Sequence, residues 1–165
     1  MKYLKYMFLF VCTYGIAQIQ TPQPSPLAKV EQEIGLTQVT IEYSRPAMRG
    51  RSIMGELVPM GELWRAGANK NSLITFSDAV KVGGIDLDAG TYSIFIRPGE
   101  SMWEVFFYTE IENSGLPAKW NPDSIAATVE VETKKLSESI ESFTIALENL
   151  NNNGATINFK WENTQ

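Results

Sequence analysis

Residues 91–108, TYSIFIRPGESMWEVFFY, carry the strongest hairpin signal in the chain and decide the fold class. Two runs rich in aromatic and β-branched residues flank a Pro-Gly-Glu-Ser turn at 98–101, and these residue types favour a reversal between two strands. Apolar side chains occupy both faces of the two runs. The pattern predicts central strands that are covered on both sides, or strands whose second face forms an aromatic groove. The apolar residues expected on that second face are Phe95, Phe106 and Tyr108.

Alternation of apolar and polar residues extends outward from this hairpin in both directions. Gly35 and the run 151–154 (Asn-Asn-Asn-Gly) supply further turns. We therefore expect an all-β protein, a single-domain antiparallel β-sandwich that is jelly-roll-like and has about nine or ten strands. One or two helical turns are expected at 134–142. The expected strands cover residues 28–34, 39–43, 72–76, 80–82, 85–87, 91–97, 102–108, 127–131, 143–147 and 155–161.

Residues 44–70 interrupt the alternation with glycines and two prolines. A stretch of this length without regular structure is usually functional or disordered. Its apolar residues, among them Ile53, Leu57 and Trp64, argue against disorder. The sequence predicts one long ordered loop that packs onto the sheet, with a short helical turn near 53–57.

The first 17 residues have the three-part pattern of a secretory signal. Lys2 and Lys5 precede an apolar run at 6–12, and small residues lead to a cleavage position after Ala17. A buried N-terminal helix is the alternative interpretation. The apolar run is shorter than the roughly 20 residues that a membrane span needs, and no later stretch approaches that length.

This pattern predicts a protein exported to the periplasm or the extracellular space. A lipid anchor on Cys12 is a second alternative, although the bulky Val11 stands where a lipoprotein signal has a small residue. The expected organisation is a signal peptide at 1–17, an extended leader at 18–26 and the β-sandwich domain at 27–165.

Composition excludes several kinds of chemistry. The chain contains no histidine, and its single cysteine lies in the expected signal. The mature protein therefore has no disulfide, thiol nucleophile, Cys/His zinc site or histidine-based triad, and we expect no cofactor and no metal. Without Lys2 and Lys5, the 14 basic residues fall to 12 against 19 acidic residues, a net charge of −7. That balance argues against nucleic acid as a partner.

Arginines are concentrated in the irregular segment, which holds four of the five in the chain. The planar guanidinium fork matches the oxygens of carboxylates, phosphates and sulfates, so four of them converging in one concavity would bind an anionic small molecule or glycan. Tyr43 and Trp64 could supply a flat surface for a sugar ring. In the alternative interpretation, each arginine pairs with an acid or caps loop carbonyls. The candidate ligand-binding residues are Tyr43, Arg45, Arg49, Arg51, Trp64, Arg65 and Asn69.

The irregular segment also resembles the domain of unknown function family 2911. The resemblance rests on Tyr-Ser-Arg-Pro at 43–46, Arg-Gly-Arg-Ser-Ile-Met-Gly at 49–55, Trp-Arg-Ala-Gly-Ala-Asn at 64–69 and Trp-Glu-Asn-Thr at 161–164, and it extends over roughly residues 25–165. It implies an exported envelope protein from a bacterium of the Bacteroidetes type. The family has no assigned activity, so the resemblance supplies no catalytic residue.

Three functions compete on these observations. The first is a non-enzymatic binding module for an anionic or carbohydrate ligand at the arginine segment. The second is an envelope structural or assembly protein whose aromatic face meets another protein. The third is a hydrolase that works through paired carboxylates, but the pairs Asp86/Asp88 and Glu110/Glu112 are spaced as neighbours on one solvent face of a strand. The absence of histidine and of a usable cysteine favours a protein that is not an enzyme.

Overall fold

The computed structural model describes residues 21–165, and this part of the chain is almost entirely β-structure. The expectation of an all-β sandwich is confirmed. The predicted signal peptide and Cys12 lie outside the described residues. Within residues 21–165, no helix has the length and apolar character needed to cross a membrane. The elements are β1 (Leu27–Ile34), β2 (Thr37–Ser44), β3 (Ala68–Phe76), β4 (Val80–Val82), β5 (Ile85–Leu87), β6 (Gly90–Pro98), β7 (Met102–Tyr108), the 3₁₀ helix η1 (Pro122–Ser124), β8 (Ile125–Glu132), β9 (Lys135–Asn151) and β10 (Gly154–Thr164).

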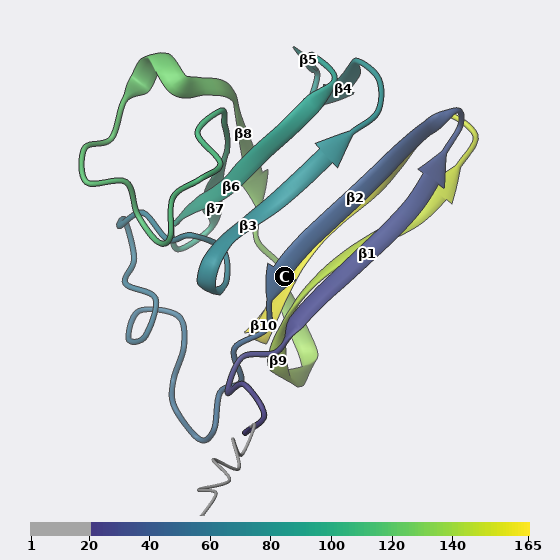
Figure 1. Ribbon diagram of the computed structural model, residues 1–165. Coiled ribbons are helices and arrows are strands. Elements are labelled where there is room, and N and C mark those ends of the chain that lie inside the picture. The colour runs from purple at the N-terminus through teal and green to yellow at the C-terminus, as the bar shows by residue number, and fades with distance from the viewer. Residues whose placement is uncertain (1–20) are drawn as a thin grey trace, which may run out of the picture.

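Six of the strands form one antiparallel sheet in the order β1-β2-β3-β6-β7-β8 (Figure 1). The hairpin expected at 91–108 is confirmed, with β6 paired to β7 from Ser93–Tyr108 to Pro98–Trp103. β3 and β8 flank this hairpin, so β6 and β7 are central strands, as their two apolar faces predict. The short strands β4 and β5 form a hairpin of their own between β3 and β6 in the sequence.

The second layer consists of the β9–β10 hairpin alone. This hairpin lies along β1 and β2 in Figure 1 and packs its apolar face on the six-stranded sheet. The layers are therefore uneven, with six strands facing two. The alternation that predicted β2, β6 and β10 places their apolar residues in this interface. Fully buried side chains between the layers include Ile41, Ile74, Ile94, Ile96, Phe143, Ile145 and Trp161.

The opposite face of the sheet is covered by the loop at 109–124, which Figure 1 shows in green beside β6 and β7. Trp120 of this loop stacks on Tyr108 with ring centroids 4.6 Å apart and meets Phe95 and Phe106 edge to face. All three of those sheet residues are buried. The second face of the hairpin is thus a small covered core, and the alternative of an open aromatic groove is wrong.

The helical turns expected at 134–142 are not formed, because β9 runs as a strand from Lys135 onward. Leu136 and Ile140 are four residues apart, a spacing that suits a helix. The end of β10 provides backbone partners for the same residues and decides the outcome, with Glu162 opposite Ile140 and Thr164 opposite Lys135. Tertiary pairing overrides the local pattern here.

The segment between β2 and β3 is ordered and packed, as predicted, with Ile53 and Val58 buried. The short helical turn expected at 53–57 is wrong. Gly55 has a positive φ of 87°, which a right-handed helix does not allow, and the Val58 amide instead donates to the Ile53 carbonyl across a turn. The carboxylate of Glu162 accepts hydrogen bonds from the amides of Ile53 and Met54, each at 3.3 Å, and fixes this turn to β10.

Candidate functional site

Tyr43 and Arg45, at the end of β2, anchor this strand to β9. The buried Tyr43 hydroxyl donates to the Ile145 carbonyl at 3.2 Å and accepts from the Ile145 amide at 3.0 Å. Arg45 donates from Nε to the Phe143 carbonyl at 3.0 Å and from Nη2 to Thr144 Oγ1 at 2.7 Å. Tyr43 therefore offers no open surface to a sugar ring, and Nε and Nη2 of Arg45 are engaged within the protein.

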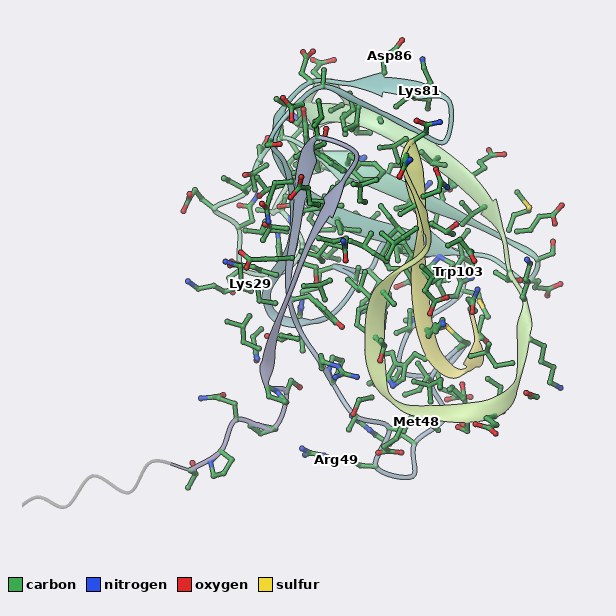
Figure 2. The ribbon with its side chains drawn as sticks, turned by 90° about the vertical axis from the view of Figure 1, so that its right-hand side faces the viewer. Lys29, Met48, Arg49, Lys81, Asp86 and Trp103 are labelled. Carbon is green, nitrogen blue, oxygen red and sulfur yellow. The ribbon has the colours of Figure 1, made fainter. Side chains whose placement is uncertain are left out.

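Arg49 and Arg51 lie in the turn that follows, and both cap backbone carbonyls. Arg51 donates to the carbonyls of Met48 and Ala47, at 2.9 and 2.7 Å, and so closes its own loop. Arg49 donates to the Pro24 carbonyl at 2.8 Å. Figure 2 shows Arg49 at the edge of the molecule, pointing away from its body. These contacts match the alternative interpretation, in which the arginines pin irregular backbone in place.

Trp64 belongs to the core between the layers. Its backbone amide and carbonyl both pair with Ile96 of β6 at 2.8 Å. Its ring stacks on Trp161 of β10, with centroids 5.8 Å apart and an interplanar angle of 22°, and meets Phe143 edge to face at 4.9 Å. The tryptophan that was expected to stack on a ligand stacks on another tryptophan instead.

Asn69, at the start of β3, ties the leader to the sheet. Its Nδ2 donates to the Ser25 carbonyl and to Ser44 Oγ, both at 3.2 Å. Tyr43 and Trp64 pack in the core, and Arg45, Arg49 and Arg51 donate to separate carbonyls. Each of these side chains anchors a different piece of backbone, so these contacts do not gather the candidate residues into one pocket.

Arg65 differs from the other three arginines. Among residues 21–165 it forms no ion pair, and its buried Nε has no hydrogen-bond partner. Asn71 of β3, which sequence analysis missed, also has a buried and unpartnered nitrogen, Nδ2. Both side chains reach Gly115. Asn71 Oδ1 accepts from the Gly115 amide at 2.9 Å, and Arg65 Nη1 lies 3.4 Å from where a Cβ on Gly115 would stand.

Asp86 and Asp88 line one concavity at the β4–β5 hairpin, but both are exposed and Asp86 pairs with Lys81. Glu31 pairs with Lys29 on the solvent face of β1. Glu110 accepts from Ser124 Oγ at 2.8 Å. Within residues 21–165, no three acidic side chains gather closely enough to hold a metal ion.

A mostly apolar cleft of about 570 Å³ lies between the sheet and the β9–β10 hairpin. It exists because two strands cannot cover six, so the layers part toward the end that carries the β4–β5 hairpin. Phe107 and Val105 of β7 form its floor, and both are buried. The remaining apolar walls include Ile34, Val82, Val129, Leu147, Ile157 and Phe159.

Polar side chains are few in this cleft. Lys81 is the one charged residue among those that line it, and its Nζ pairs with Asp86 on β5 (Figure 2). Gly83, in the β4–β5 turn, lies against Val129 of β8, because a Cβ at Gly83 would stand only 2.3 Å from Val129 Cγ1. The small hairpin therefore closes one side of the cleft. No sequence motif marks it, because its walls come from strands far apart in the chain.

Comparison with known families identifies this chain. The sequence profile of a family described as protein of unknown function (DUF2911) matches residues 25–165. The match covers most of the chain, and the chain belongs to this family. Comparison with curated proteins and with solved structures gives no match.

Proposed function

We propose that this member of the DUF2911 family is an exported, non-enzymatic binding module that holds an apolar or amphiphilic small molecule between its two layers. The observation that carries the proposal is the apolar cleft of about 570 Å³. Ligand pockets in proteins are concave, mostly apolar and roughly 300–1,000 Å³ in volume, with few polar groups. The order of basic, apolar and small residues in 1–17 supports export.

The walls of the cleft favour binding over chemistry. No acidic residue, and so no pair of carboxylates that could act as acid and base, is among the residues lining it. Apolar walls bind through loss of water-exposed surface, at roughly 25 cal/mol per Å² buried. A chain-like or ring-like apolar group fits this surface better than a sugar, which needs hydrogen-bond partners at every hydroxyl.

Binding of an anionic ligand at the arginine segment is a second candidate function, and Arg65 is the arginine that would bind the ligand. The unpartnered Nε of Arg65 favours this function, whereas Arg45, Arg49 and Arg51 donate hydrogen bonds to backbone carbonyls. Assembly through the aromatic face has less support, because Phe95, Phe106 and Tyr108 are covered by the loop at 109–124. A carboxylate hydrolase also has little support, since the acids described above lie on solvent faces.

A fluorescent fatty acid, dansyl-undecanoic acid, tests the cleft. The wild-type mature protein should bind it saturably, with a blue shift of the dansyl emission, and unlabelled palmitate should displace it. Ala155→Trp, a change at a half-buried cleft residue on β10, should weaken binding about tenfold or more by filling the space. Ala118→Trp, at an exposed position of the loop at 109–124, is the matched control and should bind as the wild type does.

Thermal unfolding of each variant verifies that it is folded. Val131→Trp, on the opposite wall of the cleft in β8, provides a second route if Ala155→Trp does not fold. The proposal fails if the wild-type protein does not bind the probe, or if a folded cleft variant binds it as tightly as the control does.

A further inference from the structure

The sheet face opposite the cleft contains two buried hydrogen-bond donors without partners, Nε of Arg65 and Nδ2 of Asn71. They come from different parts of the fold, since Arg65 precedes β3 and Asn71 lies within it. Both approach the same loop residue, Gly115, which is itself buried.

The local fold explains why Arg65 leaves the core. Trp64 pairs with Ile96 and sends its ring between the layers. Side chains alternate along extended backbone, so the neighbours of Trp64 point to the opposite face. Leu63 confirms this direction, because it packs on the covered cluster of Phe95, Phe106 and Tyr108. Arg65 accordingly reaches the loop at 109–124, away from Arg45, Arg49 and Arg51.

The orientation of the Asn71 amide is fixed by the backbone. Its Oδ1 accepts from the Gly115 amide at 2.9 Å, and a flipped amide would set two donors against each other. Nδ2 is therefore the free atom, on a side chain only 5 % exposed. Gly115 has a positive φ of 96°, so the loop presents its amide to Asn71 in a conformation that glycine readily adopts.

Both free groups are donors, and one of them belongs to a cation. A buried donor without an acceptor is costly, more so when it is charged. Among residues 21–165, the ion pairs do not include Arg65, so no described carboxylate neutralises it. An acceptor that carries negative charge would satisfy both groups.

We infer that Arg65 and Asn71, beside Gly115, form a binding site for an oxyanion: a carboxylate, a phosphate or a sulfate. Guanidinium supplies charge and a planar fork, and the amide supplies a neutral donor that adds geometric selection. Arg65 as a residue is half-buried although its Nε is buried, and Asn71 is buried more deeply. This site is independent of the apolar cleft, which lies on the other face of the sheet.

The test is a titration of the mature protein with sodium sulfate, phosphate and acetate at constant ionic strength, made up with sodium chloride. The readout is the ¹⁵N–¹H correlation of arginine side chains, in which the Arg65 Nε–H signal is the one that disappears in Arg65→Lys. At least one anion should shift this signal saturably, and comparison of the three distinguishes a carboxylate site from a phosphate or sulfate site. Melting temperature should rise with the same dependence on concentration.

Two variants distinguish anion binding at this site from a general effect of salt on the protein. Asn71→Asp keeps an oxygen for the Gly115 amide but replaces the free donor with a carboxylate oxygen beside the residue that Arg65 also approaches. It should abolish the anion response and raise the melting temperature at low salt, because the acceptor is then built in. Arg51→Gln, which alters an exposed arginine bonded to carbonyls of its own turn, should respond as the wild type does.

Arg65→Gln has no Nε–H signal, so it is followed by melting temperature alone, and the anion concentration needed to raise that temperature should increase about tenfold or more. The inference is overturned if no anion shifts the Arg65 signal saturably at constant ionic strength, since a buried water would then suffice as the acceptor. It is also overturned if Asn71→Asp, shown to be folded, binds the anions as the wild type does. Neither result bears on fatty-acid binding in the cleft, so the two proposals can fail separately.

Discussion

The Tyr43 hydroxyl satisfies both backbone groups of Ile145, donating to the carbonyl at 3.2 Å and accepting from the amide at 3.0 Å. A side chain from one layer thus makes the two backbone hydrogen bonds that a neighbouring strand would otherwise make with β9 of the other layer. Both partners are buried, so water cannot replace either hydrogen bond.

Tyr43→Phe should lower the free energy of unfolding by about 1–3 kcal/mol, because it leaves a buried amide and a buried carbonyl unsatisfied. Urea unfolding followed by tryptophan fluorescence measures the change. Tyr92→Phe is the matched control, because the Tyr92 hydroxyl makes one hydrogen bond, to the Asp88 carbonyl at 2.8 Å. An equal or larger loss in Tyr92→Phe would contradict the role given to Tyr43.

Arg45 and Arg51 should differ sharply in their effect on stability. Arg45→Met removes two hydrogen bonds that link β2 to β9 and should cost about 1.5–3 kcal/mol of unfolding free energy. Arg51→Met removes bonds within one exposed turn and should cost about 0.5 kcal/mol or less. Differential scanning calorimetry of the two variants measures this difference in stability. Similar melting temperatures would show that Arg45 is not an anchor between the layers.

Gly83→Ala should destabilise the wall of the cleft for two reasons. The added Cβ would overlap Val129 Cγ1, at 2.3 Å, and the residue has a positive φ of 56°. A loss of about 1–3 kcal/mol is expected from overpacking and backbone strain together. The double variant Gly83→Ala/Val129→Ala relieves the overlap and leaves the strain. It should therefore lose less than the sum of the two single variants, a coupling that a double-mutant cycle in urea measures.

Stability at alkaline pH should depend on Tyr92. Burial raises the pKa of this phenol above its ordinary value of 10.0, and the carboxylate of Asp88 raises the pKa further. The unfolded chain loses the proton first, so the Tyr92 contribution is complete below pH 10 and is lost as pH rises through the folded pKa. Urea unfolding of wild type and Tyr92→Phe between pH 8 and 11 should show the wild type falling more steeply above pH 10. Parallel curves would exclude this linkage.

Much of the fold could be predicted because alternation along a strand is a local pattern. The apolar residues of that pattern become the buried faces of the layers. Residues 91–108 and the final hairpin illustrate it, since nearly all of their apolar residues face a core and Met102, at 42 % exposed, is an exception. The failure at 134–142 has a different origin. Leu136 and Ile140 read as helical in isolation, and only the partner residues of β10, far along the chain, make them a strand.

The candidate site was harder to predict, because closeness in sequence does not fix direction in space. Trp64 and Arg65 are adjacent, yet one enters the core and the other reaches the loop on the opposite face. Asn71 carries no motif at all, since an asparagine in a strand reads as a solvent-facing residue until a loop covers it. The cleft depends on how much of the six-stranded sheet the two-stranded layer covers, and no single stretch of sequence encodes the covered area.

The uneven layers also set the order in which the molecule can fold. β9 and β10 provide every strand of the second layer, and they are the last two strands of the chain. The contact between Tyr43 and Ile145 joins residues 102 positions apart. A chain that is synthesised from its amino end would therefore keep one apolar sheet face exposed until residues 135–164 are available. Burial of that sheet face therefore waits for the β9–β10 hairpin to form.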